Sequence, residues 1–142
     1  MGRRVILVRR VGWERALVEF IASRRHVPYA YGHNDCCTFV RDAVIALTGT
    51  DVMPGVEPPT SRIAGARFLL AGGYGDVEGL ATKIFGQPLG APGFAGRGDV
   101  VSFEADDEMH LAVSIGVMAA TPALEGLAWV PLEIWRNGWK VG

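Results

Sequence analysis

Two things are scarce in this sequence: net charge and long apolar runs. The 14 basic and 15 acidic side chains nearly cancel, leaving a formal net charge of -1, whereas nucleic-acid binding usually depends on a clear excess of positive charge. Charged residues, glycines or prolines interrupt every apolar stretch before the roughly 18 residues that a membrane-spanning helix needs. The sequence therefore predicts neither nucleic acid as a partner nor a membrane span.

Cysteine is also scarce, and the only two, Cys36 and Cys37, are neighbours in the sequence. A disulfide between neighbours closes a strained ring and violates the usual disulfide geometry, so disulfide stapling is excluded as their purpose. The start of the chain lacks a recognisable export signal, because residues 5–8 form too short an apolar run before Arg9 and Arg10. We expect synthesis in the cytoplasm without a signal peptide.

The composition fits one ordinary globular domain. The chain has 142 residues, of which 49% are hydrophobic and 20% are charged. A chain of this length and composition can bury a hydrophobic core without disulfide bonds. We expect a single domain over residues 1–142. Apolar residues at helical spacing predict helices at residues 13–24, 36–48, 61–70 and 77–85.

The second half of the chain has a different pattern, with short apolar or alternating runs between turn signals. These runs predict strands at residues 100–103, 111–115, 117–120, 127–132 and 134–141. Helices followed by strands indicate an α+β fold, in which N-terminal helices pack on a small antiparallel sheet.

The sequence places a thiol at the start of the second predicted helix. Asp35 is a good N-cap for this helix, so Cys36 falls on its first turn. There the unpaired backbone N–H groups and the positive end of the helix dipole stabilise a thiolate. Cys37 lies about 100° further round the helix, so we expect the two side chains not to face one site. Cys36 is the predicted nucleophile, and Cys37 is expected to pack.

A nucleophilic cysteine needs a base, and histidine is the usual one. We favour His110, because it begins a predicted strand after an acidic turn, from which its ring can reach a helix N-terminus. His26 and His33 lie in the loop before Cys36, and either is a candidate for lining a substrate cleft. A zinc site is the rival hypothesis, but adjacent cysteines fit the ligand spacing of structural zinc badly. We expect no metal and no cofactor.

Three segments resemble parts of the NlpC-type cysteine peptidases, which are papain-like enzymes. Residues 35–40, Asp-Cys-Cys-Thr-Phe-Val, resemble the segment that opens the nucleophile helix in that family. Residues 98–103, Gly-Asp-Val-Val-Ser-Phe, resemble the strand that follows, and residues 110–116, His-Leu-Ala-Val-Ser-Ile-Gly, resemble the strand that carries the base. The resemblance covers residues 11–120 and implies a papain-like NlpC-type fold.

The same resemblance implies roles for individual residues. It makes Cys36 the nucleophile, with its backbone N–H in an oxyanion hole, and His110 the general base. Tyr29 stands where the family often has a tyrosine whose hydroxyl points into the site, and Tyr31 is close enough to be the alternative for this role. The side chains expected to bind substrate are Tyr31, His33 and Asp35. The implied activity is that of a cysteine peptidase or amidase, with peptide or amide bonds, such as those of peptidoglycan, as substrates.

The small size and the lack of a readable export signal resemble the branch found among phage and prophage tail-assembly proteins, so we expect tail proteins as partners and the virion as a location. The family usually has a polar side chain that orients the imidazole on the strand after the base. Residues 117–120 offer none, and Thr121 is a poor substitute, so a backbone carbonyl is the other candidate. This departure leaves an alternative: a tail-tip structural component with a peptidase-like fold and weak or no activity. Its partner surface would be sought at Trp129, Trp135 and Trp139.

Overall fold

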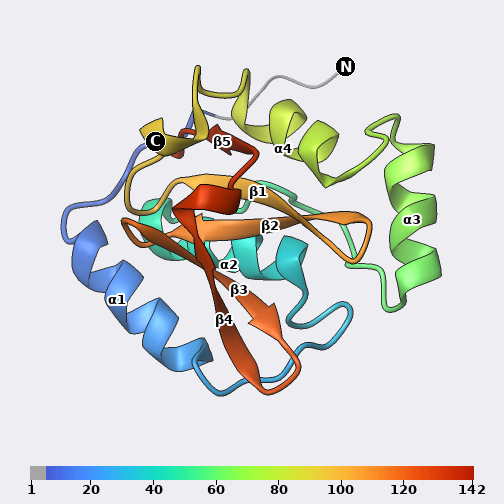
Figure 1. Ribbon diagram of the computed structural model, residues 1–142, viewed down its shortest axis with the longest axis horizontal. Helices are drawn as coiled ribbons and strands as arrows, with labels where there is room; N and C mark the ends of the chain where they lie inside the picture. Colours follow the sequence, from blue (N-terminus) through green and yellow to red (C-terminus); the bar gives the residue numbers. More distant parts are fainter. Residues whose placement is uncertain (1–5) are drawn as a thin grey trace.

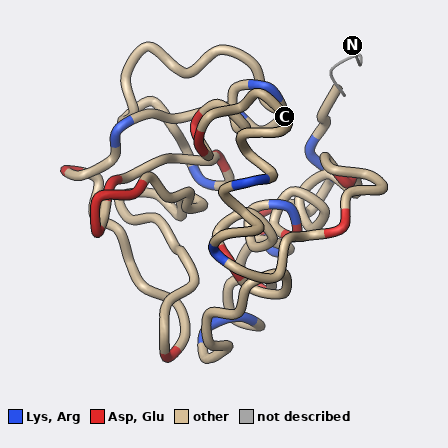
Figure 2. Tube along the Cα trace, turned by 90° about the vertical axis from the view of Figure 1, so that its right-hand side faces the viewer, with Lys and Arg blue, Asp and Glu red and all other residues tan. Residues whose placement is uncertain are grey.

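The computed structural model describes residues 6–142, and Figure 1 shows its helices arranged around one twisted sheet. Residues 1–5, on which the export-signal prediction partly rests, lie outside the described residues. In Figure 2, basic and acidic segments alternate around the chain trace, in keeping with the near-balance of charge in the sequence. Among residues 6–142, no helix is both long enough and apolar enough to cross a membrane.

Within residues 6–142, four α-helices precede the sheet, as predicted. They are α1 (Trp13–Arg24), α2 (Cys36–Thr48), α3 (Arg62–Ala71) and α4 (Val77–Phe85). Side chains cap three of them: Asp35 at α2, Ser61 at α3 and Asp76 at α4 each accept a hydrogen bond from a first-turn backbone N–H. These caps satisfy donors that the helices themselves leave unpaired, and they explain why each helix begins where it does.

Five strands form one sheet in the order β4-β3-β2-β1-β5, and every neighbouring pair is antiparallel. The strands are β1 (Val100–Ala105), β2 (Glu108–Ser114), β3 (Met118–Ala123), β4 (Gly126–Pro131) and β5 (Asn137–Trp139). The predicted α+β class, with an antiparallel sheet after the helices, is therefore confirmed.

Several strand boundaries differ from the prediction; β2, for example, begins at Glu108 instead of residue 111. Strand β3 runs on to Ala123 instead of ending at Ala120, and it includes Pro122. Only Ala119 and Ala120 of β3 pair with β2, whereas Pro122 pairs with β4 alone. The missing N–H of Pro122 therefore costs the sheet little. The predicted strand at residues 134–141 is reduced to β5, because Leu132–Ile134 forms a 3-10 turn.

The sheet buries apolar side chains on both of its faces. Alternation along β1 and β2 separates Val100, Leu111 and Val113, which pack with the apolar stripe of α2, from a second cluster on the other face. That second cluster comprises Ala95, Val101, Phe103, Ala112, Ala119, Val130 and Trp135. Trp135 and Trp139 are both buried, so of the three tryptophans considered as a partner surface only Trp129 is exposed.

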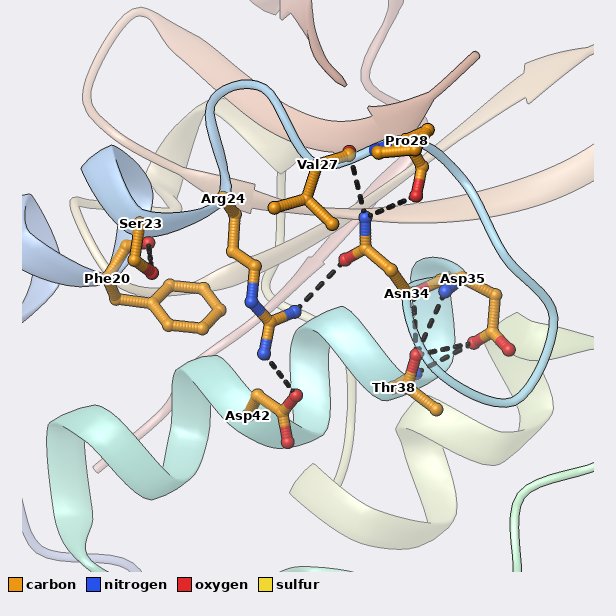
Figure 3. A network of polar contacts seen from close by, with 9 residues as sticks. All are labelled: Phe20, Ser23, Arg24, Val27, Pro28, Asn34, Asp35, Thr38 and Asp42. Atoms are coloured by element: carbon orange, nitrogen blue, oxygen red, sulfur yellow. Dashed lines mark hydrogen bonds and ion pairs between the residues drawn. The ribbon is translucent and has the colours of Figure 1, made fainter. Parts of the chain in front are cut away.

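The loop between α1 and α2 is held by a buried asparagine, as Figure 3 shows. The side-chain amide of Asn34 donates to the carbonyls of Val27 and Pro28, both at 3.1 Å. Its oxygen accepts from Arg24 at 3.0 Å, and the same guanidinium donates to Asp42 of α2 at 2.5 Å. One side chain thus fixes the start of the loop, the end of α1 and, through Arg24, the second turn of α2.

Replacing Asn34 by alanine should lower the free energy of unfolding by about 1–3 kcal/mol, because the buried amide is removed and two backbone carbonyls and one guanidinium N–H lose their partners. Ser23→Ala is the matched control, since its exposed hydroxyl bonds only the carbonyl of Phe20 on the same helix, and it should change stability by less than about 0.5 kcal/mol. Urea unfolding measures both. Equal effects of the two substitutions would contradict the role assigned to Asn34.

Candidate functional site

The amino end of α2 is fixed by a capping box. One carboxylate oxygen of Asp35 accepts from the backbone N–H of Thr38 at 2.8 Å, and the Thr38 hydroxyl accepts from the backbone N–H of Asp35 at 2.9 Å. The other carboxylate oxygen accepts from the N–H of Gly32 at 2.8 Å. Gly32 has a φ of 82°, and a Cβ there would lie 3.0 Å from Thr60, so the position requires glycine. These contacts set Cys36 on the first turn.

A cleft of about 760 Å³ opens beside this turn. Among its lining residues are Tyr29, Tyr31, Asp35, Cys36 and His110, five of the six side chains that the sequence singled out. Cys36 is only 7% exposed, which places it at the floor of the cleft rather than on the rim. Residues separated by more than 70 positions in the chain therefore meet around one thiol.

Hydrogen bonds lower the pKa of the Cys36 thiol to about 6. The largest cause is a hydrogen bond from the Cys37 side chain, and bonds from His110 and from the backbone of Leu111 act in the same direction. Burial and the charge of Asp35 oppose them by disfavouring the thiolate. The donors lower the pKa by more than burial and Asp35 raise it, so Cys36 is expected to be a thiolate at neutral pH.

The pKa of His110 is raised, chiefly by its hydrogen bond with Cys36. Its Nε2 lies 3.1 Å from the carbonyl oxygen of Ala105, and because a carbonyl can only accept, Nε2 carries the proton. The ring also stacks on Phe103, with centroids 5.3 Å apart. The Ala105 carbonyl thus orients the imidazole through Nε2, and Phe103 orients it through one ring face. The other ring nitrogen, Nδ1, remains to exchange a proton with Cys36.

A backbone carbonyl therefore takes the place of the expected orienting side chain. Ala105 ends β1, and the turn residues Asp106 and Asp107 have φ values of 53° and 60°, which brings the chain straight back into β2. The Thr121 hydroxyl donates instead to the carbonyl of Leu111 at 3.0 Å. Of the two candidates that the sequence left open, the structure selects the carbonyl.

Tyr29 and Tyr31 stand side by side at the cleft, their rings edge to face with centroids 5.1 Å apart. The backbone N–H of Tyr29 bonds the carbonyl of Ala123 at 2.8 Å, which ties this loop to the end of β3. Burial raises the pKa of Tyr29, and the nearby charge of Cys36 raises it further. Its hydroxyl therefore keeps its proton at neutral pH and remains available as a donor.

The expectation that the two cysteines would not face one site was wrong. Both line the cleft, and the hydrogen bond between their side chains raises the pKa of Cys37 while lowering that of Cys36. Neighbouring positions on a helix differ by a rotation of about 100°, but the cleft is wide enough for both side chains to border it. Cys37 is thus a neutral donor beside the predicted nucleophile.

The two remaining histidines lie elsewhere. His33 is exposed and is not among the residues that line the cleft, so we leave it out of the site. His26 lines a separate hollow of about 590 Å³ near Trp129. Among residues 6–142, no group of three or more histidines, cysteines or carboxylates is placed to hold a metal ion.

The sequence did not reveal the far wall of the cleft, which α3 provides. Ile63, Phe68 and Leu69 of this helix line the cleft, and Arg62 forms an ion pair with Glu108 at the start of β2. Figure 1 shows α3 standing apart from the other helices, beside the β1–β2 turn. The available signal was an apolar helix between a proline-rich and a glycine-rich loop, which does not indicate what the helix faces.

Alkylation of Cys36 by iodoacetamide should become faster as pH rises through about 6 and then level off, because the thiolate is the reacting form. Cys37→Ala removes the principal donor and should move this inflection to higher pH, whereas Cys37→Ser retains a donor and should move it less. Peptide mass spectrometry gives the rate at Cys36 in each protein. An inflection near the ordinary thiol value of about 8.5 in the unsubstituted protein would refute the assignment.

Comparison with known families gives one match. A family model described as a domain of unknown function, DUF6950, matches residues 8–141. The match covers nearly the whole chain, so the protein belongs to this family. A comparison with curated proteins found no match.

Proposed function

We propose that this DUF6950 protein is a cysteine peptidase or amidase of the papain-like NlpC type, which hydrolyses peptide or amide bonds such as those of peptidoglycan. One observation carries the proposal: a thiol with a pKa of about 6 lies at a capped helix N-terminus, in contact with an oriented imidazole, inside a cleft large enough for a substrate segment. The motifs around Cys36 and His110 support the family resemblance.

The chemistry would proceed by acyl transfer to sulfur. The Cys36 thiolate attacks the carbonyl carbon, and a C–S bond forms as the C–N bond breaks. The His110 imidazolium gives its proton to the leaving nitrogen. His110 then accepts a proton from water, which attacks the thioester and regenerates the thiolate. No cofactor enters this sequence of steps.

In this proposal two donors would stabilise the oxyanion. Cys36 is the first residue of α2, so its backbone N–H has no acceptor within the helix, and the helix dipole favours negative charge there. The protonated hydroxyl of Tyr29 lines the same cleft. In this proposal Tyr31 and Asp35 border the substrate, with Asp35 acting mainly through the cap.

A second candidate is a structural component of a phage tail tip that keeps the fold without efficient catalysis. Cys36 is nearly buried, and the Ala105 carbonyl that orients His110 carries no formal charge to stabilise an imidazolium. Those two features favour this alternative. An activity assay distinguishes a structural component from a cysteine peptidase or amidase.

Incubation with purified peptidoglycan should release new amino or carboxyl termini, measured by mass spectrometry of the soluble fragments. Cys36→Ala should reduce the rate by more than about a thousandfold, because the nucleophile is lost. Cys37→Ala, the matched control, should retain activity with an alkaline shift of its pH profile. Equal loss in both variants, or no release by the unsubstituted protein from peptidoglycan or simple amides, would favour the structural alternative.

A further inference from the structure

The β1–β2 hairpin turns in two residues, and the sequence fills both positions with aspartate. Ala105 of β1 pairs with Glu108 of β2, and the intervening Asp106 and Asp107 have φ values of 53° and 60°. A two-residue turn of this kind favours Asn-Gly, because both positions need a positive φ. Two adjacent like charges add repulsion to that backbone cost. Stability alone therefore does not explain the two aspartates, and unfavourable backbone conformations are frequent at functional sites.

Only part of the negative charge of this hairpin is neutralised. Glu104 and Glu108 each form an ion pair with an arginine. Among residues 6–142, neither Asp106 nor Asp107 forms an ion pair, and both side chains are exposed. The two aspartates differ in what they border, because Asp107 lines the cleft and Asp106 does not.

Asp106 is joined directly to the group that orients the imidazole. His110 Nε2 donates to the carbonyl oxygen of Ala105 at 3.1 Å, and this carbonyl belongs to the peptide bond between Ala105 and Asp106. In a planar trans peptide the carbonyl oxygen lies about 3 Å from the next Cα, so the Asp106 Cα is within about 6 Å of Nε2. Whichever way the side chain points, its carboxylate stays inside the screening length of about 10 Å at 0.1 M salt.

The charges around His110 single out Asp106 within this turn. The pKa of His110 is raised first by its hydrogen bond with Cys36, then by the charge of that thiolate, and also by the charge of Asp106. Asp107, one residue further along the turn, has no such effect.

Other titratable groups that line the cleft do not supply the same charge. They are phenols, a protonated thiol, carboxylates bonded to backbone N–H groups and carboxylates paired with arginines: Tyr29, Tyr31, Cys37, Asp35, Asp76, Glu104 and Glu108. The two arginines of the lining, Arg41 and Arg62, are themselves in ion pairs.

We propose that Asp106 is the acidic partner of His110, a positioning residue that stabilises the imidazolium across the Ala105 peptide group. The inference rests on the proposed function, because there the imidazolium must protonate the leaving nitrogen. The Asp106 carboxylate supplies the formal charge that the Ala105 carbonyl lacks. It does so without touching the substrate, since Asp106 lies outside the lining of the cleft.

An NMR titration of the His110 imidazole tests this inference, with the signal identified by its loss in His110→Gln. The titration should move to lower pH in Asp106→Asn, because the imidazolium loses a nearby negative charge. Asp107→Asn is the matched control: it removes the same charge from the same turn, asparagine tolerates positive φ, and the shift should be smaller. In about 1 M salt, where the screening length falls to about 3 Å, the difference between Asp106→Asn and the unsubstituted protein should shrink.

Cleavage of peptidoglycan or a simple amide gives a second readout. In Asp106→Asn the alkaline limb of the kcat profile should move to lower pH, because the imidazolium is lost earlier as pH rises. Thermal melting establishes that both variants are folded. A His110 titration that is unchanged in Asp106→Asn, that shifts equally in Asp107→Asn, or whose shift does not depend on salt overturns the inference and leaves the proposed function intact. Absence of any cleavage overturns the proposed function and, with it, the catalytic part of the inference, even where the titration shifts.

Discussion

The buried amino end of α2 is the constraint on which the rest of the site depends. A thiolate in a nearly buried position is costly unless donors surround it, and here the cap itself adds a negative charge, because Asp35 raises the pKa of Cys36. Hydrogen bonds from Cys37, His110 and the backbone of Leu111 together outweigh that cost. The site therefore works only while α2 begins at Cys36.

Contacts from several parts of the chain position the start of α2 and the imidazole beside it. Asp35 closes the capping box with Thr38 and also holds Gly32, and Asn34 joins the preceding loop to α1 and α2. On the sheet side, the tight β1–β2 turn returns the chain so that the Ala105 carbonyl meets His110. The thiol is thus positioned by the start of α2 and the imidazole by the β1–β2 turn.

The sequence predicted those parts of the molecule that local chemistry determines. Capping residues and apolar spacing gave the four helices, and the alternating runs gave the sheet. The meeting of Cys36 with His110 was predicted from the cap and from the family resemblance. Two predictions failed because they depend on tertiary packing: β3 extends through Pro122, where its partner is β4 alone, and Cys37 borders the same cleft as its neighbour Cys36. Every residue has a backbone carbonyl, so the sequence does not indicate which one orients an imidazole. The sequence therefore left a backbone carbonyl and Thr121 as the two candidates.

The coupling between Cys36 and His110 is the central claim, and an NMR titration of the His110 imidazole tests it most directly. The raised pKa of His110 has its hydrogen bond with Cys36 as its largest cause. In the unsubstituted protein the imidazole should therefore remain protonated to higher pH than a free histidine, whose pKa is about 6.5. In Cys36→Ala this pKa should fall. An imidazole that titrates at the same pH in both proteins would contradict the account.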